Sequence, residues 1–151
     1  MLFPVGHEVS ADEFSSIDGV WTSYTPTWLC VTGTNPVLGN GILTGRWRYA
    51  NPSESHLQII VEISLTAGTT TTYGTGVWIF GLPFNQSASG RAVGSVSLTD
   101  SGSTIRPGVA QSGSGVGNVQ LISPTGQVTA LVPQTWAVND NVQIWMSYEQ
   151  A

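Results

Sequence analysis

The stretch HLQIIVEISLT at residues 56–66 is the clearest structural signal in the chain. Every second residue is apolar: Leu57, Ile59, Val61, Ile63 and Leu65. The alternate positions carry His56, Gln58, Ile60, Glu62 and Ser64. Because successive side chains of a strand point to opposite faces of a sheet, this pattern predicts a β-strand with one buried face. The other face is expected to meet solvent or another subunit.

The same alternation continues on both sides of this stretch. Residues 42–49 predict a half-buried strand whose outer face is cationic because of Arg46 and Arg48. Residues 77–82 are apolar at adjacent positions, which predicts a central strand covered on both faces. Further strands are predicted at residues 27–32, 92–99, 104–111, 116–122, 127–132 and 142–149.

Turn-forming segments rich in Gly, Pro, Asn and Ser separate these strands, for example at residues 33–41 and 123–127. Only 9% of residues are charged, against about 25% in an average soluble domain, and helix surfaces need such residues. About 8–9 short strands at this spacing predict an all-β, antiparallel β-sandwich of the jelly-roll type. Within it, Gly81, Gly94 and Pro107 are expected at bulges or sheet edges.

The first twenty residues differ from the rest of the chain in charge. They hold four carboxylates and no arginine, and so carry −4 of the net charge of −5. Ser10 and Glu13 fit a capping box, which predicts a short helix over residues 11–18. We therefore expect a docking arm at residues 1–20, followed by a β-domain at residues 21–151. The residues expected to dock the arm are Val9, Ser10, Asp12, Glu13, Phe14 and Ile17.

Composition excludes several classes of function. The chain has no lysine and only four arginines against nine carboxylates, whereas a nucleic-acid partner requires a basic field. One cysteine, Cys30, and two histidines are too few for a zinc site, and no metal or other cofactor is expected. The amino terminus does not resemble a secretory signal, and no apolar stretch approaches the roughly 20 residues of a membrane span. The protein is expected to be soluble and to act as translated.

No arrangement of residues indicates catalysis. His7 lies in the arm and His56 opens a strand, so neither is placed to activate a nucleophile. The sequence TDSG at residues 99–102 is more typical of a turn than of a protease. Asp140 is expected in a solvated turn rather than in a calcium site, because no other acidic cluster is near it in sequence.

Four of the six tryptophans can be assigned to the core or to the surface. Three are expected in the core: Trp28, Trp47 and Trp78. Trp145 alternates with apolar neighbours and is predicted to face away from them. Glu62 is expected to form a structural salt bridge with Arg46 or Arg48. The candidate interface or ligand surface consists of Ile60, Trp145, Arg46 and Arg48, and its apolar area on a low-charge surface predicts a homotrimer.

Several motifs resemble a domain of actinobacteriophages and related prophages that occurs in tail-associated and other virion surface proteins. They are FPVGHEVSADEFSSI at 3–17, YTPTW at 24–28, GTNPVLGNGILTGRWRY at 33–49 and TAGTTTTYGTGVWIFGLP at 66–83. The likeness also covers the closing TWAVNDNVQI at 135–144, whereas residues 84–132 look individual. The resemblance implies a homotrimeric β-sandwich displayed on a virion, and it carries no catalytic residues.

These observations predict a non-enzymatic structural protein of a tailed phage, assembled in the host cytoplasm and exposed on the virion surface. Its partners would be capsid or tail proteins of the same virion, with a host cell-surface glycan as a further partner. Two locations on the virion fit these observations. The protein is either a capsid decoration or head-fibre protein, or a tail-associated host-binding module. A free carbohydrate-binding module is the alternative, because exposed tryptophans can stack on sugars. A glycan depolymerase is less consistent with the scarcity of paired acids.

Overall fold

The computed structural model describes residues 20–52, 57–113 and 115–151. These residues form ten strands and no helix, which confirms the prediction of an all-β fold. No helix in the described part of the chain is long and apolar enough to cross a membrane. The helix predicted at residues 11–18, all six docking-arm residues, His7 and His56 lie outside the described residues.

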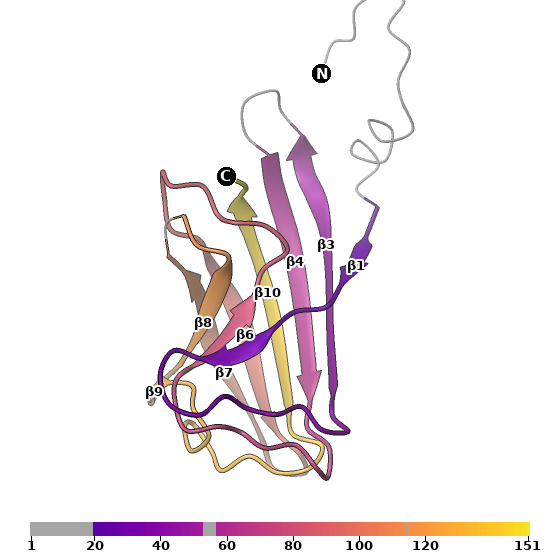
Figure 1. The fold of residues 1–151 in the computed structure, drawn as a ribbon, viewed down its shortest axis with the longest axis vertical. Helices are drawn as coiled ribbons and strands as arrows, with labels where there is room; N and C mark the ends of the chain where they lie inside the picture. The colour runs from indigo at the N-terminus through magenta and orange to yellow at the C-terminus, as the bar shows by residue number, and fades with distance from the viewer. Residues whose placement is uncertain (1–19, 53–56, 114) are drawn as a thin grey trace, which may run out of the picture.

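The strands form one antiparallel sheet. In chain order they are β1 (Thr22–Tyr24), β2 (Trp28–Cys30), β3 (Ile42–Pro52), β4 (Leu57–Thr66), β5 (Trp78–Gly81), β6 (Val93–Asp100), β7 (Thr104–Ser112), β8 (Asn118–Ser123), β9 (Gly126–Gln127) and β10 (Asn141–Glu149). Their order in the sheet is β1-β3-β4-β10-β6-β7-β8-β5-β2, with β9 paired to β8. Figure 1 shows the long strands β3, β4 and β10 side by side.

The two edge strands of this sheet are neighbours in the chain. β1 pairs with β3 at one edge and β2 pairs with β5 at the other, yet only residues 25–27 separate them. The chain therefore crosses from one edge to the other, and the sheet curls strongly into a half-barrel (Figure 1). This single curled sheet takes the place of the predicted jelly-roll sandwich. Strand order depends on long-range pairing, which an alternating pattern does not encode.

Two tyrosine hydroxyls tie β1 and β10 to the end of β5 and the residues after it. The Tyr24 hydroxyl donates a hydrogen bond to the Gly81 carbonyl (3.1 Å), and the Tyr148 hydroxyl donates one to the Phe84 carbonyl (3.0 Å). Burial raises the pKa of Tyr148 from 10.0 to about 12, against the opposing effect of its hydrogen bond to Phe84. Burial, and to a lesser extent Tyr148, also raises the pKa of Tyr24.

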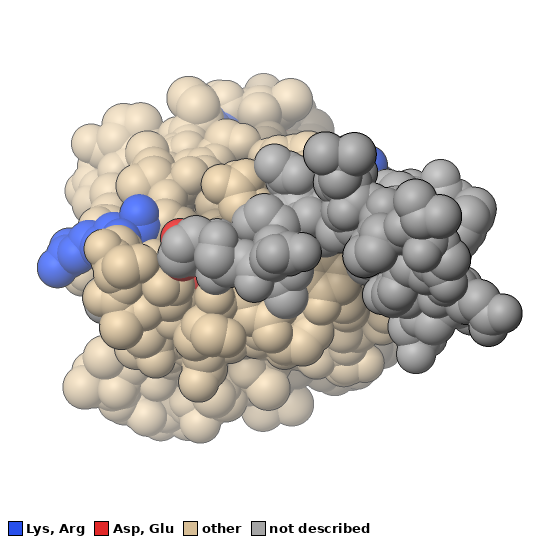
Figure 2. Space-filling view, turned by 90° about the horizontal axis from the view of Figure 1, so that it is seen from above, with Lys and Arg blue, Asp and Glu red and all other residues tan. Residues whose placement is uncertain are grey.

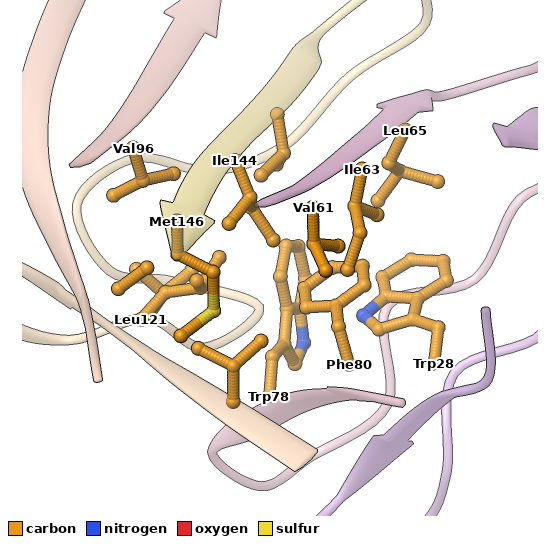
Figure 3. Packing of buried hydrophobic residues seen from close by; sticks show 14 of the residues in the cluster. Trp28, Val61, Ile63, Leu65, Trp78, Phe80, Val96, Leu121, Ile144 and Met146 are labelled. Atoms are coloured by element: carbon orange, nitrogen blue, oxygen red, sulfur yellow. The ribbon is translucent and has the colours of Figure 1, made fainter. Parts of the chain in front are cut away.

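The core lies on the concave side of the sheet (Figure 3). The alternation predicted for β4 is confirmed, because its inward side chains are buried: Ile59, Val61, Ile63 and Leu65. Trp78 is fully buried, with the ring centroids of Trp28 and Trp136 each 4.8 Å away. Trp28 is also buried, and Trp47 is half-buried against the cluster, so the tryptophans expected in the core all pack there.

Some strands differ from their predicted places. β5 is not a central strand covered twice, because it pairs with the edge strand β2 and Ile79 on its outer face is half-exposed. β1 was not indicated by the sequence pattern, and the strand predicted at residues 127–132 is reduced to β9. Cys30 is half-buried in β2. Pro107 lies in the part of β7 that pairs with β6 alone, as its missing N–H requires.

Gly81 and Gly94 lie at close approaches between segments rather than at bulges. A Cβ on Gly94 would stand 2.4 Å from the Cβ of Met146, and one on Gly81 would stand 2.5 Å from the Thr27 hydroxyl oxygen. A register shift between β3 and β4 falls instead after Tyr49. At these two glycines the absence of a side chain therefore allows close packing.

Asp140 is buried, which corrects the solvated turn predicted for it. Its carboxylate accepts hydrogen bonds from the backbone N–H of Ala137 (2.8 Å), the backbone N–H of Ser101 (2.8 Å) and the Gln134 side-chain amide (3.2 Å). It thereby ties the turn before β10 to the β6–β7 hairpin. That hairpin contains the TDSG sequence, which forms the predicted turn, with Ser103 N donating to Asp100 O (3.0 Å).

Candidate ligand-binding groove

A groove of about 780 Å³ lies on the outer face of the sheet, opposite the core. Its lining comes from β1, β3, β4, β10, β6 and β7. The lining side chains alternate along each strand with buried ones, as Trp145 does between the buried Ile144 and Met146. The groove is therefore a product of the same period-two pattern that builds the core.

One row of cross-strand partners forms a tall wall of the groove. Ser23 pairs with Arg46, Arg46 with Glu62, Glu62 with Trp145, and Trp145 with Ser95. Side chains at paired positions share a face of the sheet, so this row places charged and aromatic groups side by side. The Arg46 guanidinium donates to the Glu62 carboxylate, as the sequence predicted.

Trp21 and Trp145 lean toward each other across the two strands that separate β1 from β10. Their ring centroids are 6.2 Å apart with an interplanar angle of 73°, an edge-to-face arrangement. The Arg46 guanidinium carbon lies 4.4 Å from the Trp21 ring centroid and that of Arg48 lies 5.1 Å from it, both within cation–π range. These contacts hold the two indoles in place, and Trp145 remains 46% exposed.

The floor of the groove consists of uncharged polar side chains. In the next row, Gln143 pairs with Ser64 on one side and with Ser97 on the other, and Thr44 lies beyond Ser64. The Thr44, Ser64 and Ser97 side chains are shorter than those of Arg46, Glu62 and Trp145 in the neighbouring row, so the surface is hollowed beside these three larger residues. Ile105, which is 69% exposed and lines the far side, closes the depression.

The charges that line the groove cancel. Among the described residues that line it, Arg46 is the single cation and Glu62 the single carboxylate, and they pair with each other. Their side chains are 52% and 23% exposed, so the pair contributes about 0–1 kcal/mol to stability. On the face seen in Figure 2, the described residues are mostly uncharged. No group of three or more His, Cys, Asp or Glu among the described residues could hold a metal ion.

The chain is similar to one curated protein of phage origin, the Mu-like prophage FluMu defective tail fiber protein of Haemophilus influenzae (strain ATCC 51907 / DSM 11121 / KW20 / Rd). The identity is 32% over 132 residues, which cover 83% of the chain. The chain is a distant homologue of this tail fiber protein. It spans about a fifth of the tail fiber protein's length, 20%. No protein-family model and no solved structure matches the chain.

The homology to the tail fiber protein agrees with the phage resemblance of the sequence motifs, and the structure places the candidate surface residues on one face. Trp145 and Arg46 line the groove, and Arg48 stacks beside Trp21 at its end. Ile60 pairs with Arg48 on the same outer face and is half-buried. Trp21 was missing from the predicted set, because it precedes the short strand β1, and the sequence there has no alternating pattern that would assign a face to it.

Proposed function

We propose that the chain is a non-enzymatic structural domain of a phage tail, exposed on the surface of the virion. The observation that carries this proposal is the homology to a tail fiber protein over 132 residues. The fold is consistent with it, since the two edge strands β1 and β2 are each only three residues long, and very short edge strands limit unwanted pairing. Between the two locations that the sequence left open, the homology favours the tail over capsid decoration or a head fibre.

The groove supports a binding role rather than catalysis. Glycoside hydrolysis requires two carboxylates placed roughly 5–10 Å apart across the sugar. Among the described residues that line the groove, only Glu62 is acidic, and its carboxylate forms an ion pair with the Arg46 guanidinium. A depolymerase mechanism therefore lacks its second carboxylate at this place.

The docking arm and the homotrimer belong to the same proposal. Residues 1–20 would bind a neighbouring virion protein through the apolar and acidic side chains predicted for that role. Large apolar side chains are exposed on the β-domain at Val31, Val37, Val93 and Leu131. A trimer would cover part of this area, as closed symmetric assemblies do.

Incorporation into virions tests the proposal. Particles are separated into heads and tails, and the chain is quantified by mass spectrometry in each fraction. We expect it in the tail fraction, and we expect a version that starts at Val20 to fold as a β-domain but to be absent from particles. Detection in heads only, or in neither fraction, would contradict the tail assignment. Normal incorporation of the shortened version would contradict only the docking role of the arm and not the location in the tail.

A further inference from the structure

We infer that the outer groove binds a neutral pyranose unit of a cell-surface glycan, with Trp145 as the stacking platform. This inference rests on the proposed function, because a virion-surface domain meets the host envelope. Nothing in the sequence motifs or in the homology assigns a ligand to this groove. Its volume of about 780 Å³ lies within the roughly 300–1,000 Å³ of typical small-ligand sites.

The aromatic component is already fixed in place. A pyranose ring has an apolar C–H face that packs on an indole, and this contact is strongest when the indole does not have to be ordered on binding. Trp145 meets that condition, because Trp21 packs edge-on against it and the Arg46 guanidinium lies over Trp21. The exposed area of Trp145 is thus preorganised rather than mobile.

The polar component surrounds the platform. Gln143, Ser64 and Ser97 form the floor beside Trp145, and no described residue makes a hydrogen bond with any of these three side chains. An amide and hydroxyl groups offer both donors and acceptors, which sugar hydroxyls need. The Arg46–Glu62 pair adds guanidinium donors and a carboxylate acceptor at the adjacent wall.

The charge balance selects the class of sugar. An acidic sugar would require an uncompensated cation among the lining residues, but the lining cation Arg46 is already neutralised by Glu62, and Arg48 lies against Trp21 outside the lining. A contact between copies of the chain is a poorer match, because the cores of such interfaces are apolar and depleted of charge. Here the floor is polar and the wall contains an ion pair. A neutral hexose or N-acetylhexosamine therefore fits the lining best.

The test uses the full chain on an array of bacterial surface glycans that contains neutral and acidic sugars, followed by calorimetric titration of the strongest binder. We expect selective binding of neutral glycans. Trp145→Ala should weaken the affinity by about tenfold or more, and Gln143→Ala by a smaller factor. The matched controls are Val138→Ala and Gln127→Ala, which change an exposed apolar residue and an exposed amide outside the groove lining and should leave binding unchanged.

Four outcomes would overturn the inference: no binding, binding of acidic glycans only, equal binding by Trp145→Ala and the wild type, or a change of oligomeric mass in Trp145→Ala. The last outcome would make the groove a subunit contact. Failure of the glycan-binding inference is distinguishable from failure of the proposed function. Trp145→Ala should still enter virions if the chain is a tail component, and the purified chain can bind glycans whether or not it is found in tails.

Discussion

Replacing Asp140 by alanine should destabilise the domain strongly, although this residue lies in a turn. In the wild type, the backbone N–H groups of Ala137 and Ser101 each donate to the Asp140 carboxylate at a distance of 2.8 Å. The substitution leaves both N–H groups without this acceptor. Hydrogen bonds to charged groups contribute roughly 1.5–3 kcal/mol each. Two such losses add up to about 3–6 kcal/mol, of which water reaching the turn would restore a part. We therefore expect a decrease of about 3 kcal/mol in the free energy of unfolding.

Urea denaturation followed by tryptophan fluorescence measures this change, with the slope of the transition compared between variants. Asp100→Ala is the matched control. The Asp100 carboxylate is 32% exposed and lies 3.9 Å from the Arg106 guanidinium, a contact that contributes under about 1 kcal/mol. If Asp140→Ala is no more destabilising than Asp100→Ala, the buried carboxylate does not hold the two turns together at this end of the sheet.

Three further predictions concern packing, pH and metals. Gly94→Ala should destabilise the domain by about 1–3 kcal/mol, because the added Cβ would stand 2.4 Å from the Cβ of Met146. Thermal or urea unfolding measures this change. An unchanged stability would mean that β6 and β10 are less closely packed than described. Since the pKa of Tyr148 is raised from 10.0 to about 12 on folding, the unfolded chain loses this proton first. The contribution of Tyr148 to stability should be fully present below about pH 10 and be lost toward pH 12, and Tyr148→Phe should flatten this fall. Prolonged chelation should leave the melting temperature unchanged, and a drop of several degrees would indicate a bound cation, for which Asp140 is the first residue to test.

The local pattern of the chain was sufficient to predict most strands and their buried faces. The alternation in β4 and β10 places Ile59 in the core and Trp145 on the surface, as the structure does. The pairing of Glu62 with Arg46 was also predictable, since two outward residues on adjacent strands can meet. These features depend on neighbours in sequence or on one strand pairing.

The remaining features depend on contacts between distant segments. The strand order, with β1 and β2 at opposite edges, follows from long-range pairing that no local pattern specifies. The burial of Asp140 follows from donors at Ser101 and Gln134, one of them 39 residues away. The groove required the register of six strands, so the sequence indicated its members Trp145 and Arg46 but neither its floor nor the supporting Trp21.

Immunogold electron microscopy of intact particles tests the central claim most directly. An antibody against the folded β-domain is applied to purified virions, and the gold positions are scored along each particle. We expect label on the tail, which would place the domain where a tail fiber component belongs and where the groove can reach the host. Label confined to the capsid, or particles without label in preparations that contain the protein, would contradict it.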